Sequence, residues 1–146
     1  MQVLLRPASI DDSLAIATLV GELGYPANPG DIEARLSVLI GSDRYFIAVA
    51  AESSGGLLGL VNAERRLTIE SGTSYELTGL VVSASARRTG VGSALVAAAE
   101  AWALSHGASS LRVRSDVVRP EAHSFYAGRG YALQKTQHCY VKPLRA

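Results

Sequence analysis

The sequence has a single cysteine, Cys139, among its 146 residues. One cysteine excludes an intramolecular disulfide and a metal site built from several cysteines. Basic and acidic side chains nearly balance, with 14 Lys plus Arg against 13 Asp plus Glu. Proteins that hold nucleic acid through its phosphates favour an excess of basic charge, so we expect neither a nucleic-acid partner nor a polybasic membrane anchor.

Long apolar runs are also missing, and none approaches the roughly 20 residues that a membrane-spanning helix needs. Residues 1–6 lack the basic and then apolar layout of a signal peptide, so we expect a cytoplasmic protein. The apolar share of 48% is too high for a disordered chain. The length fits one domain, residues 1–146, which can bury enough surface to fold without disulfides or metals.

Apolar periodicity and turn residues predict the element order β-α-α-β-β-β-α-β-α-β. Strands are expected at 2–6, 45–51, 57–67, 75–82 and 110–114, with one or two more within 131–142. Helices are expected at 10–23, at 90–106 and at 120–128. A further helix is expected to begin after Asn28 and to carry Leu39 on its inner stripe. The prediction is an α/β (α+β) domain with a mixed, mostly antiparallel sheet of six or seven strands and about four helices.

The most specific local feature is a glycine loop between a predicted strand and a long predicted helix, with the sequence Arg87-Arg88-Thr89-Gly90-Val91-Gly92-Ser93. The start of a helix presents N–H groups without helical partners and a partial positive charge. Glycine lets a ligand approach the backbone, and the two arginines add charge. The loop therefore predicts a phosphate or pyrophosphate site, although glycines that serve only the turn are the alternative. The Lys-Ser/Thr end of a P-loop is absent, which argues against a nucleoside triphosphatase.

Three segments carry a family resemblance. The spacing Arg87-x-x-Gly90-x-Gly92 is followed later by residues 122–131, which read Ala-x-x-x-Tyr-x-x-x-Gly-Tyr, and residues 76–82 precede both. The first is similar to the acyl-CoA signature of the GNAT superfamily of N-acetyltransferases, and the others resemble its helix-then-strand segment and its fourth strand. The predicted element order also matches the family's fold, so the resemblance spans nearly the whole chain.

The resemblance implies acetyl-CoA as co-substrate and a set of residues that bind it. The pyrophosphate would bind beside Arg87 at the backbone amides of Arg88, Thr89, Gly90, Val91, Gly92 and Ser93. The backbone of Leu80, Val81 and Val82 would pair with the pantetheine arm in the manner of a strand. We expect that strand to bulge at Gly79, because a glycine inside a strand often marks a bulge. Many members carry an Asn at the position of Arg119, where it orders the turn that contacts CoA, and Asp116 is the nearest polar candidate to replace it.

Acetyl transfer to an amine needs a base for the amine, a donor for the oxyanion and an acid for the thiolate. The resemblance points to Glu76 as the base, acting directly or through water, with a solvated strand-edge carboxylate as the alternative. It points to Tyr126 as the acid, since a phenol with a pKa near 10 is protonated at pH 7; the alternative is a core aromatic. An N–H near Val81 or Val82 would bind the oxyanion of the tetrahedral intermediate.

The acceptor would be a primary amine on a small molecule or a peptide. Tyr25, in the break between the first two helices, and Glu76 are candidate contacts for it. Histidines at helical metal-ligand spacing are absent, so no metal is expected. Family members are often dimers, which suggests a homodimer by analogy. The alternative function is a regulatory or sensor domain that binds acyl-CoA without catalysis.

Overall fold

Five strands form one sheet in the computed structural model, which describes residues 3–22, 24–114 and 120–145. In sheet order they are β1 (Val3–Pro7), β2 (Tyr45–Glu52), β3 (Leu57–Thr68), β4 (Gly72–Val82) and β5 (Arg112–Val113). The first four pair antiparallel, and β5 pairs parallel with β4. Tight turns join β2 to β3 and β3 to β4, which fixes their antiparallel direction, whereas the parallel pair needs a helical crossover.

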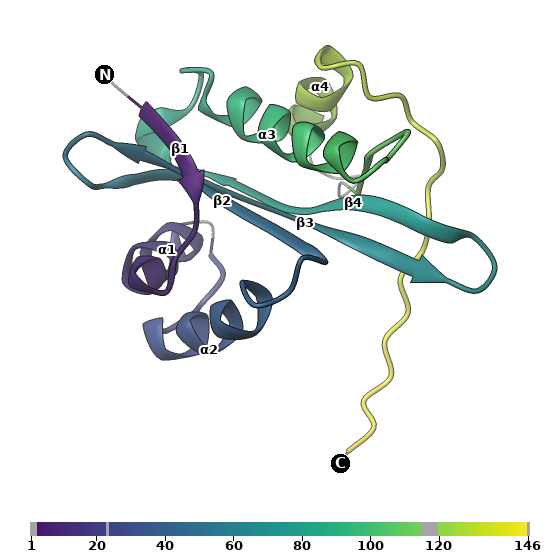
Figure 1. Ribbon diagram of the computed structural model, residues 1–146, viewed down its shortest axis with the longest axis horizontal. Helices are drawn as coiled ribbons and strands as arrows, with labels where there is room; N and C mark the ends of the chain where they lie inside the picture. Colours follow the sequence, from purple (N-terminus) through teal and green to yellow (C-terminus); the bar gives the residue numbers. More distant parts are fainter. Residues whose placement is uncertain (1–2, 23, 115–119, 146) are drawn as a thin grey trace. The chain divides into compact units, whose positions relative to one another are not determined.

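Helices cover both faces of this sheet (Figure 1). The helices α1 (Ser13–Gly21) and α2 (Pro29–Leu39) lie on one face, and α3 (Val91–Ser105) lies on the other. The side chain of Asn28 caps α2 by accepting a hydrogen bond from the N–H of Asp31 at 2.8 Å. A 3-10 turn, η1 (Ile10–Asp12), precedes α1, and a second, η2 (Ala84–Ala86), precedes the glycine loop. Among the described residues, no helix is long and apolar enough to span a membrane.

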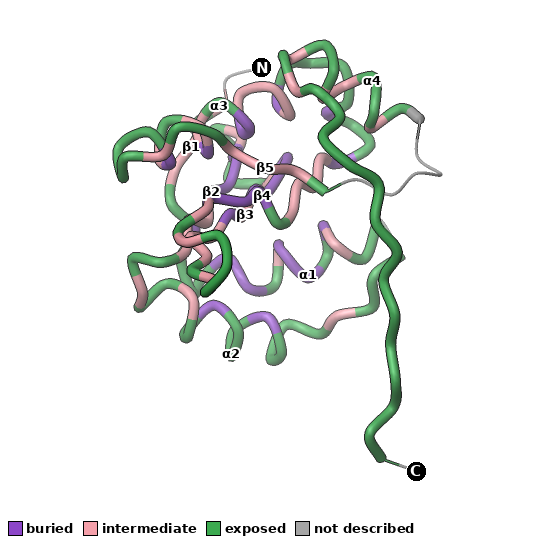
Figure 2. The backbone as a smooth tube through the Cα atoms, turned by 90° about the vertical axis from the view of Figure 1, so that its right-hand side faces the viewer, coloured by how far each residue is buried: buried purple, intermediate pink, exposed green. Residues whose placement is uncertain are grey.

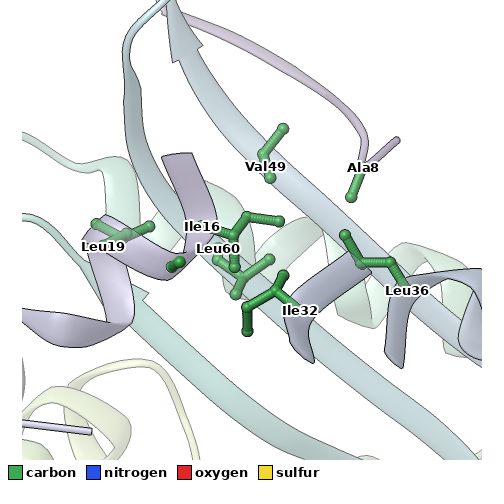
Figure 3. Close-up of a cluster of buried hydrophobic side chains, with 8 residues drawn as sticks. Ala8, Ile16, Leu19, Ile32, Leu36, Val49 and Leu60 are labelled. Atoms are coloured by element: carbon green, nitrogen blue, oxygen red, sulfur yellow. The ribbon is translucent and has the colours of Figure 1, made fainter. Parts of the chain in front are cut away.

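Buried residues concentrate in the central strands and on the inner stripes of the helices (Figure 2). On the α1 and α2 face, the core joins two residues of α1, Ile16 and Leu19, to Val49 of β2 and Leu60 of β3 (Figure 3). The opposite face is closed by α3, where Leu95 is fully buried. Burial of these apolar groups stabilises the layered arrangement and fixes which side of each strand faces each helix layer.

Residues 115–146 form a second compact unit, separate from residues 1–114. Its described part contains α4 (Pro120–Gly128), with the bounds that the sequence predicts, followed by an extended segment. The predicted strands within 131–142 are wrong: residues 131–145 form no strand, and Leu133 and Tyr140 are almost fully exposed. The described sheet therefore has five strands and not six or seven. A segment with strand-like composition forms a strand only where a pairing partner is present, and none is described for residues 131–142.

The helix predicted at 10–23 begins as the turn η1 and ends as α1 at Gly21, and Leu23 lies outside the described residues. The predicted bulge at Gly79 is confirmed. In the register between β3 and β4, Asn62 faces Gly79 and Ala63 faces Leu77, so Thr78 is the additional residue. The amide of Asn62 donates to Thr78 Oγ1 at 2.7 Å and lies where a Cβ on residue 79 would be. Only glycine fits at this position without displacing Asn62.

An ion pair between Arg6 and Asp12 lies at the start of α1. The guanidinium of Arg6 donates to both carboxylate oxygens of Asp12 at 2.8 Å, and the backbone N–H of Ser9 donates to the same group at 2.8 Å. These bonds, led by those of Arg6, lower the pKa of Asp12. A lowered pKa stabilises the fold above the unfolded value of about 3.9, and the contribution is lost as the pH falls toward the folded value.

Asp12→Asn is expected to lower the free energy of unfolding by about 2 kcal/mol at pH 7, in the range for hydrogen bonds to a charged group. The variant should also lose part of the acid destabilisation that the natural chain shows below about pH 4. Urea unfolding from pH 3 to pH 7 measures both effects. Equal stability of the two proteins at pH 7 would show that the ion pair contributes nothing.

Candidate active site

Two residues of the glycine loop lie in the left-handed backbone region. Arg88 has a φ of 65° and Gly90 a φ of 89°, and Arg88 is the one non-glycine with positive φ among the described residues. A side chain in this conformation costs on the order of 1 kcal/mol, and such strain concentrates at ligand sites. The hydroxyl of Thr89 donates to the carbonyl of Ala86, and the N–H of Thr89 donates to the same oxygen at 3.3 Å. These two hydrogen bonds to Ala86 help to set the backbone conformation of the loop.

The N-terminus of α3 follows directly. Gly90 is the N-cap residue and supplies no side chain to cap the helix. The first helical hydrogen bond runs from Ala94 N–H to Gly90 carbonyl at 3.0 Å, so the N–H groups of residues 91–93 come before the helical ladder begins. Arg87 and Arg88 are exposed beside them. This arrangement of amide donors, helix end and guanidinium groups suits a phosphate anion.

One edge of β4 has no described strand beside it over the last residues of the strand. The parallel pairing with β5 covers only Glu76 and Leu77, so the last residues of β4 have no described neighbour on the β5 side. The N–H of Ser83 donates to Leu58 of β3 at 2.8 Å. Because backbone groups alternate in direction along a strand, those of Val81 face β3, and those of Leu80 and Val82 face the open edge. Leu80 and Val82 therefore present donors and acceptors for an extended ligand.

Glu76 lies on β4 opposite Glu64 of β3 and is 7% exposed. Its Oε1 accepts a hydrogen bond from Arg114 Nε at 3.1 Å and lies 3.6 Å from Arg66 Nη1. Glu64 lies 3.7 Å from Arg66 Nε through Oε1 and 3.7 Å from Arg44 Nη2 through Oε2. We call these five residues the Glu–Arg cluster: Arg44, Glu64, Arg66, Glu76 and Arg114.

A cavity of about 230 Å³ adjoins this cluster. Residues from the end of α2 and from three neighbouring strands line it: Leu39, Tyr45, Ile47, Asn62, Ala63, Glu64 and Thr78. Asn62, Glu64 and Thr78 give one wall hydrogen-bonding groups, and the remaining lining is apolar or aromatic. Ile47 also packs against the α1 and α2 core, which places the cavity on that face of the sheet. It therefore combines an apolar body with a few polar groups, as ligand sites do.

The other predicted site residues lie on different parts of the chain. Tyr25 follows α1, is 55% exposed and is not among the lining residues. Tyr126 is half-buried on α4, with its ring at 5.1 Å from Phe125 and 5.7 Å from Tyr131. Burial raises the pKa of the Tyr126 hydroxyl, so the phenol is held protonated. Asp116 lies outside the described residues. No group of three or more potential metal ligands gathers within the described ranges.

Sequence reasoning did not single out Glu64, Arg66 or the cavity. The sequence does contain a signal, because Glu64 and Arg66 are two residues apart and so share one face of a predicted strand. That pattern alone is typical of a solvated strand face. The two glutamates come together only because the register of β3 and β4 sets Glu64 opposite Glu76, and that register depends on pairing across the sheet.

Comparison with known proteins identifies the relatives of this chain. The sequence is 33% identical over 101 residues to aminoglycoside N(6')-acetyltransferase type 1 of Klebsiella aerogenes; the match covers 67% of this chain and 66% of the relative, slightly under two thirds of it. The fold matches glucosamine-6-phosphate N-acetyltransferase of Arabidopsis thaliana with a TM-score of 0.85 at 18% identity, covering 97% and 99% of the two chains. It matches AAC(6')-Iy, solved with the bisubstrate analogue CoA-S-monomethyl-acetylneamine, with a TM-score of 0.85 at 20% identity, covering 98% and 99%.

A family model assigns the chain directly. The model of the acetyltransferase (GNAT) family matches residues 19–131, a stretch that contains the glycine loop, β4 and the helix with Tyr126. The match covers well over half of the sequence and agrees with the motif resemblance and with the fold of the solved structures. The chain therefore belongs to the acetyltransferase (GNAT) family.

Proposed function

We propose that this protein transfers an acetyl group from acetyl-CoA to the primary amine of a small molecule. The observation that carries the proposal is the loop of residues 87–93, where Arg88 and Gly90 in the left-handed backbone region precede the N-terminus of α3, an arrangement that supports an anion site. The open edge of β4 lies just before it in the chain. We further propose that residues 1–146 act as one domain, since the family match crosses the boundary between the two compact units.

Binding of acetyl-CoA is assigned to two backbone segments. The amides of Val91, Gly92 and Ser93 would bind the pyrophosphate with Arg87 and Arg88 supplying charge, because Thr89 N–H already donates to Ala86. Leu80 and Val82 face the open edge of β4 and would pair with the pantetheine arm. The solved relative that holds a CoA-containing bisubstrate analogue supports this co-substrate. Acetyl-CoA supplies the thioester whose carbonyl carbon is attacked.

The transfer step follows from the chemistry of a thioester and an amine. The amine nitrogen forms a bond to the carbonyl carbon, and the carbon–sulfur bond then breaks. We propose that Glu76, directly or through water, accepts the proton that the amine loses. An N–H near Val82 would stabilise the oxyanion, and Tyr126, whose pKa is raised by burial, would donate a proton to the CoA thiolate.

The names of the relatives favour a small molecule over a protein as acceptor. One relative is named for aminoglycosides and one structural neighbour for glucosamine 6-phosphate, and both names describe small amines. The cavity of about 230 Å³ beside Glu64 has room for a small group and not for a folded protein surface. We therefore place the reacting amine in or beside this cavity.

The test is thiol release from acetyl-CoA with a panel of primary amines, together with calorimetric binding of CoA. We expect CoA to bind and at least one amine to raise the initial rate above that of thioester hydrolysis. Tight CoA binding without transfer to any amine, including peptide amines, would contradict the proposal and favour a non-catalytic acyl-CoA sensor. Absence of CoA binding would contradict both functions.

A further inference from the structure

The Glu–Arg cluster contains more positive than negative charge. Three guanidinium groups, on Arg44, Arg66 and Arg114, meet two carboxylates, on Glu64 and Glu76. The neighbouring Arg65 does not alter the balance, because it pairs with Asp43 at 3.5 Å. Three guanidinium groups therefore lie beside two carboxylates, whereas a site for a polycationic amine would need an excess of carboxylates.

Within the cluster, Arg114 lies closer to its glutamate partner than Arg66 does to either glutamate. Arg114 makes a hydrogen bond of 3.1 Å to Glu76, so the charge of that carboxylate is largely matched. Arg66 approaches Glu76 and Glu64 only at 3.6 and 3.7 Å, beyond the usual length of an N–H to oxygen hydrogen bond. The guanidinium of Arg66 thus has donors that the two glutamates do not engage closely.

Arg44 donates through Nε to the carbonyl of Arg65 at 3.0 Å, whereas its terminal Nη2 has no such close contact with Glu64. It lies 3.7 Å from Glu64 and stacks over the ring of Tyr45, which lines the cavity. Its side chain is 50% exposed, and that of Arg66 is 38% exposed, so both can be reached from solvent. Arg44 also lines a second cavity of about 300 Å³. A planar guanidinium binds a carboxylate or phosphate through paired hydrogen bonds.

We propose that the acceptor carries an acidic group, a carboxylate or a phosphate, in addition to its amine. The acidic group would bind Arg44 and Arg66 at the rim, and the body of the acceptor would occupy the cavity beside Asn62 and Thr78. Arg44 and Arg66 are then residues that determine specificity. This inference rests on the proposed function and deepens it by naming the class of acceptor.

Pairs of amines that differ in the acidic group test the proposal. Butylamine is compared with 4-aminobutyrate for a carboxylate, and ethanolamine with O-phosphoethanolamine for a phosphate, while spermidine represents polycations. We expect kcat/KM to be at least about tenfold higher for the acidic member of one pair, and that pair identifies the acidic group. Preference for the acid-free amines or for spermidine would overturn the proposal.

Substitution then separates recognition from a structural role. Arg66→Gln and Arg44→Gln should each lower the preference in kcat/KM for the acidic amine over its acid-free partner about tenfold, chiefly by raising KM for the acidic amine. Arg35→Gln, which makes the same change on the exposed side of α2, should leave the preference intact. An equal effect on both members of the pair would show that the arginines only stabilise the sheet.

A direct measurement of ligand binding tests the role of Arg66 without depending on acetyl transfer. Calorimetry with CoA present measures the affinity of O-phosphoethanolamine and of 4-aminobutyrate for the natural chain and for Arg66→Gln. Binding that weakens about tenfold in the variant supports the proposal even if no amine is acetylated, in which case the proposed transfer alone has failed. Binding that is absent, or unchanged by Arg66→Gln, contradicts it whether or not acetyl transfer occurs.

Discussion

Gly92→Glu is expected to weaken acetyl-CoA binding at least about 100-fold while leaving the fold intact. The new carboxylate would lie in the first turn of α3, where the amides of residues 91–93 precede the helical ladder. It would repel the pyrophosphate and compete for the same donors, and hydrogen bonds to charged groups contribute about 1.5–3 kcal/mol each. Two such bonds exceed the roughly 2.7 kcal/mol that corresponds to 100-fold in affinity.

The fold should tolerate this change. An acidic residue in the first turn interacts favourably with the helix dipole, by about 0.3–1 kcal/mol, and glycine is a weak helix former. Calorimetric titration of acetyl-CoA and the thermal midpoint of unfolding measure the two effects separately. Gly92→Ala is the matched control, because a methyl group adds no charge, and it should bind within a few-fold of the natural chain. Normal affinity in Gly92→Glu would remove the pyrophosphate from this loop.

Tyr126→Phe is expected to lower kcat about 100-fold, at the lower end of what a positioned general acid contributes. Burial raises the pKa of Tyr126, so the hydroxyl stays protonated across the neutral range and can donate when the thiolate forms. Phenylalanine keeps the ring and its contacts with Phe125 and Tyr131. Affinity for acetyl-CoA should therefore stay within about twofold, and the loss should appear in the rate of the chemical step.

The control for this substitution is Tyr131→Phe, which removes a hydroxyl from a ring in edge contact with Tyr126. It should leave kcat near that of the natural chain, since Tyr131 is given no part in the transfer. Single-turnover thiol release, with both substrates saturating, isolates the chemical step from product release. An unchanged rate in Tyr126→Phe would exclude the tyrosine as the acid.

Much of the fold follows from local patterns in the sequence. Asn28 before Pro29 marks the start of α2, the glycine loop marks the start of α3, and Gly79 marks the bulge in β4. Each of these signals depends on a few adjacent residues with special backbone or capping properties. The structure agrees with them because the same local physics operates in the folded chain.

Features that depend on contacts between distant segments could not be predicted in this way. Residues 131–142 have strand-like composition, yet no pairing partner appears among the described residues, so the predicted strands are absent. The Glu–Arg cluster needs the register that brings Glu64 opposite Glu76, together with Arg114, 38 residues further along the chain than Glu76. Glu76 was singled out by its motif position, whereas its two arginine partners emerged only from the fold.

The most direct test of the account follows the acetyl group itself. Acetyl-CoA labelled with ¹³C at the acetyl carbonyl is incubated with the protein and the amine that gives the fastest thiol release, and the products are read by NMR. The account predicts that the label moves from the thioester to an amide of the amine, with one free thiol formed for each amide. Label that remains in the thioester, or that appears as free acetate while the amine is unchanged, would contradict acetyl transfer as the function of this protein.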